Sequence, residues 1–248
     1  MSNLKIPYNL KEYNDGEWKE IIKNICIETK ITLIINEKLI ISLTCIPMQL
    51  EELAIGFLIS EGLISDIKRI ELIDVDDSNI CISISNFKYN KKINEKIEIR
   101  TSGYIGLEQI SIKPIEPLKA NIKLDPKIIF VSQKLVNGKA EIWKETGGTH
   151  QAGIFNEKGK LLAYAEDCGR HNAIDKVIGK IYMENINPSQ CFLVSTGRQS
   201  YNMVSKVGRA KIPMIISNTA PLSRGIDLAR KIGIKLICFS REPKLCLY

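Results

Sequence analysis

The sequence contains no CxxC pair among its seven cysteines and has only two histidines, His150 and His171. This pattern excludes a four-cysteine zinc site and a disulfide framework, which needs paired cysteines in a small secreted domain. No apolar run approaches the ~20 residues of a membrane-spanning helix, and the N-terminus lacks the basic-then-apolar pattern of a signal peptide. We therefore expect a reduced, cytoplasmic protein.

Clusters of lysine and arginine are also lacking. The net charge of +7 arises from 35 basic residues against 28 acidic ones, and the basic residues are scattered along the chain. Such a charge suits an anionic partner, but without basic clusters or stacking aromatics a nucleic-acid-binding module is disfavoured. With 248 residues, 44% of them hydrophobic, the chain can bury one large or two modest cores.

The first half of the chain has the pattern of a small α+β domain. Residues 1–16 are polar and expected to be loosely ordered, whereas residues 18–46 are rich in β-branched residues and predict two or three antiparallel strands. A helix is predicted from Pro47 to about Gly62. Period-two alternation then predicts strands at residues 69–75, 80–84 and 93–99. We assign residues 1–112 to this N-terminal domain.

The second half, residues 113–248, follows a linker marked by two prolines and alternates by type. Asp125-Pro126 and Asn137-Gly138 are start and stop signals of a helix, and a hairpin is expected at residues 156–159. Helices are then predicted at residues 170–184, 200–211 and 222–232, and strands at residues 191–195, 214–217 and 235–239. This order predicts a parallel sheet with helices on its faces.

Three polar segments, residues 195–200, 217–224 and 240–244, lie where the strands of this sheet are expected to end, and residues 146–150 and 166–172 are two further polar segments. In open α/β sheets, ligands bind beyond the carboxyl ends of the strands, near helix N-termini. Hydroxyls, glycine N–H groups and arginines at such positions suit a phosphate-bearing ligand. None of the segments is a Walker loop or a GxGxxG fingerprint. The segments that we expect to share one anion-binding site are residues 146–150, 166–172, 195–200, 217–224 and 240–244.

The segment 166–176 is the densest in functional groups and precedes an apolar stripe at helical spacing. One interpretation is a capped helix start, with Asp167 or Asn172 as the cap. Another is an acid–base pair of Asp167 and His171. Metal binding through His150 and His171 is disfavoured because the cysteine spacing of a zinc deaminase is absent, so we predict no metal site.

Five of these motifs together resemble the formate dehydrogenase accessory protein family, FdhD. They are residues 51–62, 146–150, 166–176, 195–200 and 217–221, and the resemblance runs from about residue 20 to the C-terminus. It implies a small N-terminal domain followed by a three-layer α/β/α domain with a cytidine-deaminase-like fold that lacks the zinc site.

The resemblance also implies a function. Members are homodimers that bind the bis-molybdopterin guanine dinucleotide form of the molybdenum cofactor, for which GDP or GMP would be a partial mimic. They are thought to take sulfur from a cysteine desulfurase and pass it to that cofactor before its insertion into apo formate dehydrogenase. We expect Arg170 and Arg198 to hold phosphates, Asn218 to bind a base or pterin edge, and the glycines to allow close approach.

The candidate cofactor-binding residues come from the polar segments, and the resemblance adds Phe239 and also supports residues 240–244. They are Gly147, Gly148, His150, Asp167, Arg170, His171, Asn172, Thr196, Gly197, Arg198, Ser200, Asn218, Thr219, Phe239, Ser240, Arg241, Glu242, Pro243 and Lys244.

One departure from the family pattern bears on the chemistry. Tyr104 stands where the family carries its sulfur-accepting cysteine, and no other cysteine lies between positions 81 and 168. A persulfide needs a thiolate, which tyrosine cannot supply. Three interpretations stay open: a cofactor carrier that moves no sulfur, a substitute thiol, or a pocket for another guanine nucleotide, including an enzyme that uses Asp167 and His171.

Cys168 is the best candidate for a substitute thiol. It lies beside Arg170 near a helix start, and both features would lower its pKa. The alternative is a small residue packed under the loop.

Overall fold

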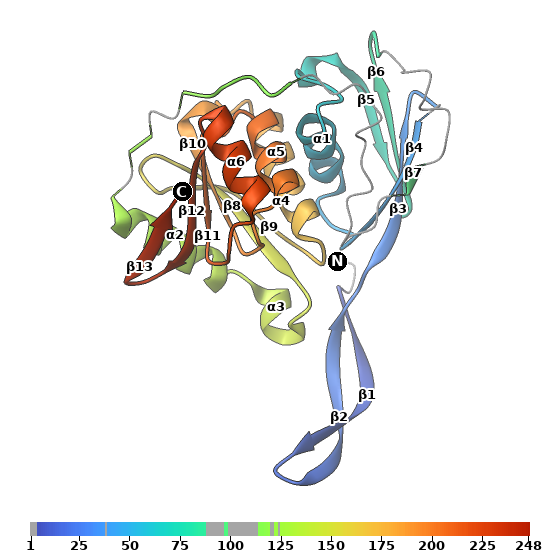
Figure 1. Cartoon of the computed structure of the whole chain (residues 1–248). Coiled ribbons are helices and arrows are strands. Elements are labelled where there is room, and N and C mark those ends of the chain that lie inside the picture. Colours follow the sequence, from blue (N-terminus) through green and yellow to red (C-terminus); the bar gives the residue numbers. More distant parts are fainter. Residues whose placement is uncertain (1–3, 38, 88–96, 99–113, 120–121, 124) are drawn as a thin grey trace.

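The computed structural model describes all residues except 1–3, 38, 88–96, 99–113, 120–121 and 124. The described residues form a two-stranded hairpin, a five-stranded sheet and a six-stranded sheet (Figure 1). Helices lie between the two larger sheets and on the outer face of the six-stranded one. No helix in the described part of the chain is long and apolar enough to cross a membrane.

The chain begins with the hairpin of β1 (Lys5–Asn14) and β2 (Glu17–Cys26), which pair antiparallel over their full length. Asp15 and Gly16 form the turn, and both have positive φ (51° and 90°), as a tight Asp-Gly hairpin requires. The expectation that residues 1–16 are loosely ordered was therefore wrong for residues 5–16, and residues 1–3 lie outside the described part of the chain. The many polar residues of this segment gave no sequence signal for a strand. The strand forms because of the Asp15-Gly16 turn and the pairing with β2.

The five-stranded sheet has the order β5-β6-β3-β4-β7, and its strands confirm those predicted for the first half, except that the strand predicted at residues 93–99 is described only at residues 97–98. They are β3 (Thr29–Ile35), β4 (Leu39–Cys45), β5 (Ile70–Val75), β6 (Asn79–Ile84) and β7 (Ile97–Glu98). A short 3-10 helix, η1 (Ile67–Arg69), precedes β5. Helix α1 (Leu50–Ser60) confirms the helix predicted after Pro47, and its side chains from Leu53 to Ser60 are buried.

The six-stranded sheet has the order β13-β12-β11-β10-β8-β9. Its strands are β8 (His150–Asn156), β9 (Leu161–Asp167), β10 (Cys191–Ser195), β11 (Met214–Ser217), β12 (Lys235–Arg241) and β13 (Lys244–Leu247). Strands β10, β11 and β12 are parallel, as predicted, whereas β8, β9 and β13 run antiparallel to their neighbours. The sheet is therefore mixed. Strand β13 was not predicted, and its first residue, Lys244, was interpreted as the end of a ligand-binding segment.

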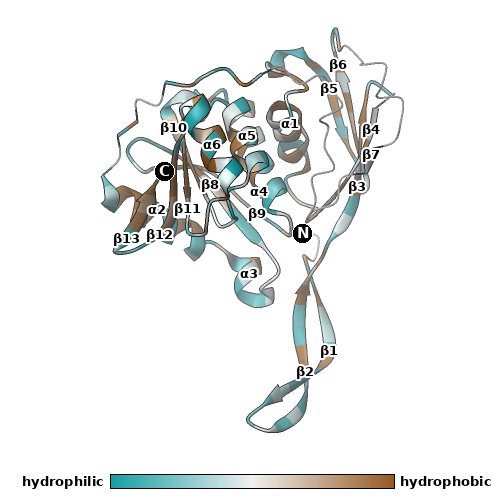
Figure 2. Ribbon diagram, viewed as in Figure 1, coloured by the Kyte–Doolittle hydropathy of each residue, from teal (hydrophilic) through white to brown (hydrophobic). Residues whose placement is uncertain are grey.

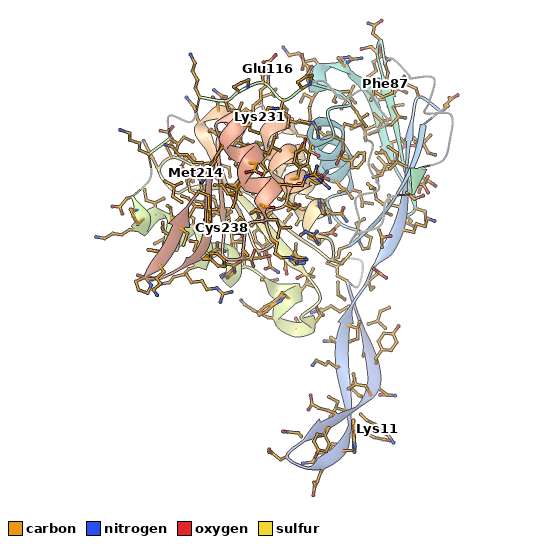
Figure 3. All side chains as sticks on the ribbon, viewed as in Figure 1. Lys11, Phe87, Glu116, Met214, Lys231 and Cys238 are labelled. Carbon is orange, nitrogen blue, oxygen red and sulfur yellow. The ribbon has the colours of Figure 1, made fainter. Side chains whose placement is uncertain are left out.

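Helices cover both faces of the six-stranded sheet (Figure 1). They are α2 (Pro126–Gly138), α3 (Glu141–Thr146), α4 (Arg170–Met183), α5 (Tyr201–Arg209) and α6 (Ser223–Ile232), with η3 (Pro188–Gln190) before β10. On one face Met214 of β11 packs in a core with Ile129 and Val136 of α2. On the other, Cys238 of β12 packs in a core with residues of α4, α5 and α6 (Figure 3). Among the described helices of this half, α3 and the 3-10 helix η3 are the ones that the sequence did not predict.

The two halves of the chain share one core, because α1 of the first half packs directly on α4 of the second. Gly56 and Gly179 allow this approach: a Cβ at Gly56 would lie 1.7 Å from the Asp175 carbonyl oxygen, and one at Gly179 would lie 1.9 Å from that of Glu52. The hydrophobic cluster of the five-stranded sheet continues without a break into α4–α6. The predicted domain boundary at residues 112 and 113 lies outside the described residues.

Two buried ion pairs reinforce this junction. Lys206 of α5 pairs with Glu61 (2.6 Å) and Asp175 (2.8 Å), and its Nζ also donates to the hydroxyl of Ser60 (2.9 Å). Burial raises the pKa of Asp175 to about 6. Burial alone would lower the pKa of Lys206, but Asp175 and Glu61 together raise it. Lys206 and Asp175 are therefore both ionised at neutral pH. Together with Glu61, they connect the end of α1 to α4 and α5.

Candidate functional site

A cavity of about 500 Å³ lies at the edge where β10 and β11 end, β8 begins and β9 ends. This is the edge at which the sequence predicts a ligand site. Helices α2 and α3 close its outer side. The lining residues are Asn137, Ala140, Trp143, Gly147, Gly148, Thr149, His150, Gln151, Cys168, Thr196, Asn218 and Thr219.

Six of the predicted cofactor-binding residues line this cavity, together with the candidate thiol, Cys168. The six are Gly147, Gly148, His150, Thr196, Asn218 and Thr219. They come from three of the five polar segments, separated by up to about seventy positions in the sequence. This arrangement agrees with the prediction for these three segments, which was that they converge on one site.

The hydroxyls of the cavity wall hold the strand ends together. Thr196 Oγ1 accepts a hydrogen bond from the Gln151 amide (3.0 Å), which connects the end of β10 to the start of β8. Behind the wall, Ser217 Oγ donates to the Gly197 carbonyl (2.9 Å) and accepts from the amide of the lining residue Thr219 (3.1 Å). By contrast, Asn218 Oδ1 is buried and has no hydrogen-bond partner among the described residues. Since buried polar atoms are nearly always paired, this oxygen is a free acceptor for a ligand donor.

Glu166 organises the rim of the cavity; it lies in the predicted segment 166–172 but was not among the individually predicted site residues. Its carboxylate accepts from the amides of Ile142 and Trp143 (both 3.1 Å) and from the hydroxyl of Thr149 (2.8 Å). It thereby caps the start of α3, which carries Trp143 into the cavity wall. Gly138 and Gly147 flank this short helix in the sequence. That spacing was the signal that could have predicted α3 and identified Trp143 as a residue of the cavity wall.

Asp167 does not line the cavity. It is fully buried, pairs with Lys176 (2.7 Å) and accepts from the amides of Ile46 (3.1 Å) and Gly169 (2.8 Å). Asn172 donates to the same carboxylate (2.9 Å) and to the carbonyl of Thr44. The structure therefore corrects the assignment of both residues to a ligand site: they join the start of α4 to the first half of the chain.

Two arginines lie beside the cavity rather than in its wall. The side chain of Arg170 packs over Gly197, where a Cβ would come within 2.9–3.4 Å of it. Burial lowers the pKa of Arg170, and the positive charge of the exposed Arg198 lowers it further. Burial and the charge of Arg170 likewise lower the pKa of His150, a lining residue. The two guanidinium groups therefore form a cationic patch next to His150.

His171 is mostly buried at the start of α4. Burial, followed by the charges of Lys206 and Arg170, lowers its pKa to about 3, so the ring is neutral at neutral pH. Its Nε2 has no partner among the described residues. With Asp167 already fully hydrogen-bonded and neither residue in the cavity wall, this geometry does not support an acid–base pair of Asp167 and His171.

Cys168 does line the cavity, but its electrostatic environment is the opposite of the one predicted. Burial raises the pKa of its thiol, and so do the charge of Asp167 and a contact between Sγ and Asp167 Oδ1 (3.5 Å). The sequence suggested a pKa lowered by Arg170 and the helix start. Burial and the neighbouring carboxylate dominate instead, so the thiol is protonated at neutral pH.

The C-terminal segment is largely strand and turn. Phe239 has a positive φ of 52° and is 45% exposed, and its amide donates to the carbonyl of the lining residue Thr219 (3.1 Å). Ser240 is buried, and Glu242 pairs with Lys134 of α2. Of residues 239–244, Phe239 is the one joined directly to the cavity wall. The others, Arg241, Pro243 and Lys244 included, belong to β12, β13 and the turn between them.

The remaining predictions fall outside the cavity or outside the described residues. Ser200 is the N-cap of α5 and accepts from the amide of Met203. Tyr104 lies outside the described residues. Among the residues that the structure describes, no group of three or more histidine, cysteine or acidic side chains could hold a metal ion.

Comparison with known proteins identifies the family. The profile of the FdhD/NarQ family matches residues 26–248. The sulfur carrier protein FdhD of Methanothermobacter thermautotrophicus is 30% identical over 234 residues, which cover 94% of this chain and 92% of that protein. That of Thermoplasma volcanium is 33% identical over 214 residues, covering 82% and 77%.

A solved structure agrees with this result. A crystal structure from Desulfotalea psychrophila, assigned to a formate dehydrogenase accessory protein, has a TM-score of 0.81 to this chain at 28% identity. The match covers 99% of this chain and 97% of the other. With its mixed α/β fold and a family match over nearly all of its length, the chain belongs to the FdhD/NarQ family.

Proposed function

We propose that this protein is an accessory factor for formate dehydrogenase that binds Mo-bis(molybdopterin guanine dinucleotide) at the described cavity and serves in its sulfuration or delivery. Relatives of similar length are named sulfur carrier proteins, and a solved relative is assigned as a formate dehydrogenase accessory protein. In this proposal a cysteine desulfurase supplies the sulfur and apo formate dehydrogenase receives the cofactor. The free cysteines suit a reducing compartment, and we place the reaction in the cytoplasm.

The unpartnered Oδ1 of Asn218 is the observation that supports this proposal best. Guanine and pterin rings both present adjacent N–H donors, which a buried amide oxygen can accept. Gly147 has a φ of 68°, and no described atom lies within 4 Å of the point that a Cβ would occupy there, which leaves room for a planar ring. The fit is therefore good for the base or pterin end of the cofactor.

The diphosphate would lie on the cationic patch of Arg170 and Arg198. The described residues that line the cavity include no arginine or lysine, so phosphate groups would be placed outside it, on the side of His150. Guanidinium groups bind phosphate oxygens through paired hydrogen bonds. The proposed ligand thus runs from Asn218, past His150, to the two arginines.

Binding of GDP tests this arrangement. Replacing Arg198 with alanine is expected to weaken GDP binding by about 1.5–3 kcal/mol, the value of a hydrogen bond to a charged group. Calorimetry with GDP and guanosine should show that the variant loses affinity for GDP and not for guanosine, because guanosine carries no phosphate. Asn218→Ala should weaken both ligands.

Arg230 provides the matched control. It is an exposed arginine in the last turn of α6, whereas the cavity lies at the edge where the helices of this layer begin. Arg230→Ala should therefore bind GDP as the wild-type protein does. Unchanged GDP affinity in Arg198→Ala would show that Arg198 does not contact the nucleotide. Absence of GDP binding by the wild-type protein would refute the proposed placement of the nucleotide in this cavity.

We also propose that residues 113–248 have the cytidine-deaminase-like arrangement. A mixed sheet with α2 on one face and α4–α6 on the other supports this assignment. The family lacks the zinc site of that fold, and the described residues offer no cluster of ligands for one.

Sulfur transfer requires a thiol, and Cys168 is the cysteine in the wall of the described cavity. Its sulfur would attack the outer sulfur of a desulfurase persulfide. A new S–S bond would form at Cys168, the donor S–S bond would break, and the donor thiol would leave with the proton that Cys168 loses. The raised pKa favours the alternative, a cofactor carrier that moves no sulfur.

Sulfur loading distinguishes these two functions. If Cys168 accepts sulfur, incubation with a cysteine desulfurase and cysteine should add one sulfur at this residue, as mapped by mass spectrometry. Because the thiolate is the nucleophile and burial raises the pKa, the loading rate should increase as the pH rises from 7 to 9. Cys168→Ala should abolish loading, whereas Cys81→Ala, which removes an exposed thiol on β6, should not.

If wild-type protein gains no sulfur but binds GDP, it is a carrier without the sulfur step. Loading that persists in Cys168→Ala would exclude Cys168 as the acceptor.

A further inference from the structure

A second cysteine, Cys26, lies directly behind the cavity wall. The β1–β2 hairpin projects from the body of the molecule and meets it at its base (Figure 2). There Glu145 of α3 accepts a hydrogen bond from Asn24 (3.2 Å), and β2 ends with Cys26, which is half-buried. A Cβ added at the lining residue Gly148 would lie 3.1 Å from the Cβ of Cys26. The end of the hairpin therefore brings a thiol against the wall of the cavity.

Cys168 reaches the same stretch of the wall from the six-stranded sheet. Strands β8 and β9 pair antiparallel, with His150 opposite Asp167. The residue that follows Asp167 therefore lies beside the residues that lead into β8. Both Cys168 and Gly148 line the cavity there. Cys26 and Cys168 thus lie next to the same short segment, although 142 positions separate them in the sequence.

The two thiols also act on each other electrostatically. Burial and the charge of Asp167 raise the pKa of Cys168, and the charge of an ionised Cys26 raises it further. Because such effects fall off with distance, the two thiols are near neighbours. Burial also raises the pKa of Cys26, whereas the cation of Lys176 lowers it. Cys26 is already ionised when Cys168 titrates, so Cys26 is the thiol that can attack the other.

The other cysteines are not placed for this reaction. Cys45 belongs to the same cluster, but it is fully buried at the end of β4, and burial raises its pKa to about 12. The remaining four lie on β6, β10, β12 and β13, and none of them is among the described residues that line the cavity. Cys26 is therefore the best-placed partner for Cys168.

We propose that Cys26 is the resolving thiol of Cys168. Once Cys168 carries an extra sulfur, the thiolate of Cys26 attacks the Sγ atom of Cys168. A Cys26–Cys168 disulfide forms, the bond between Sγ and the outer sulfur breaks, and the outer sulfur leaves as hydrosulfide. The two electrons that reduce this sulfur come from the two thiols. A dithiol reductant restores both thiols before the next cycle.

The inference rests on the proposed function in one respect, namely that the extra sulfur comes from a persulfide. In that case the hydrosulfide is released at the cavity in which the cofactor is proposed to bind. The exchange chemistry itself needs neither a desulfurase nor a cofactor. A mixed disulfide at Cys168 should be resolved in the same way, with its small thiol as the leaving group.

Oxidised glutathione therefore tests the pair directly. The full-length chain carries Cys81→Ser and Cys246→Ser in this experiment, because both thiols are exposed and would react on their own. With Cys26 present, mass spectrometry should show a product lighter by two hydrogen atoms and a peptide map with a Cys26–Cys168 disulfide. Cys26→Ala should lose this disulfide and keep one glutathione on Cys168 instead.

Cys45→Ala is the matched control, because it removes a thiol from the same cluster and leaves the pair intact. It should form the disulfide as the parent chain does. Glutathione that stays on Cys168 when Cys26 is present, a disulfide that requires Cys45, or no disulfide at all would overturn the proposal.

Sulfur loading separates this result from the proposed function. After loading by a desulfurase and removal of that enzyme, the parent chain should lose the sulfur of Cys168 as sulfide, whereas Cys26→Ala should retain it. A disulfide formed with oxidised glutathione in a protein that gains no sulfur would establish the thiol pair and refute sulfur transfer. Equal retention of sulfur by the parent chain and Cys26→Ala would exclude Cys26 as the resolving thiol.

Discussion

Replacing Gly56 with alanine is expected to lower the free energy of unfolding by at least about 3 kcal/mol, the upper part of the usual cost of overpacking. The added Cβ would lie 1.7 Å from the Asp175 carbonyl oxygen and 2.5 Å from its carbonyl carbon. Both are backbone atoms of α4, so no change of side-chain rotamer relieves the clash. The two helices must move apart, and this opens the core that the two sheets share.

Urea unfolding followed by circular dichroism measures this effect. Gly179→Ala should be similarly destabilising, because its Cβ would lie 1.9 Å from the Glu52 carbonyl oxygen. Gly138→Ala is the control, since no described atom lies within 4 Å of the added carbon there, and its stability should stay within about 1 kcal/mol of wild type. A Gly56→Ala protein with the wild-type unfolding midpoint would show that α1 and α4 are not in this close contact.

Replacing Lys206 with methionine is expected to cost about 3–5 kcal/mol, the usual result of removing one partner from a buried ion pair. The substitution leaves the carboxylates of Asp175 and Glu61 buried without their cation. Lys180→Met is the control. Lys180 is a partly exposed lysine of α4 that pairs with Glu184 at 3.2 Å, and its loss should cost less than about 1 kcal/mol.

The cost of Lys206→Met should depend on pH. Burial raises the folded-state pKa of Asp175 to about 6, above its ordinary value of 3.8. The protonated carboxyl therefore favours the folded chain, and this stability is lost as the pH rises from about 4 to about 6. Without the charge of Lys206, which lowers this pKa, the loss continues to higher pH. The variant should therefore be closer to wild type at pH 5 than at pH 7.5 in the same urea measurement, and an equal deficit at both pH values would contradict this account.

Much of the fold could be predicted because its signals are local. The stripe of Ile174, Val177, Ile178 and Ile181 predicted α4, and all four side chains are fully buried. Asp125, which accepts from the Lys127 amide, marked the start of α2. Strand β1 was missed because its stability depends on a partner strand rather than on its own composition.

The candidate site was less predictable, because its electrostatics arise from contacts between distant parts of the sequence. Asp167 looked like a ligand-binding residue until its partners Lys176 and Ile46 were known, and Ile46 lies 121 positions away. Cys168 looked activated because an arginine lies close to it in the sequence, but burial and Asp167 determine its pKa. Thr196 and Asn218, by contrast, follow from the rule that the carboxyl ends of parallel strands meet at one edge of a sheet.

The shared core of α1 and α4 also constrains how the protein is made. Helix α1 has buried side chains at every position from Leu53 to Ser60, yet its partner helix begins at Arg170. A ribosome that adds about 5–20 residues per second needs on the order of ten seconds to reach α4 after it has made α1. During that interval the face of α1 that packs on α4 in the folded protein has no partner helix to cover it. Messages truncated before codon 170 should therefore yield chains that aggregate or are held by chaperones, rather than a smaller folded product.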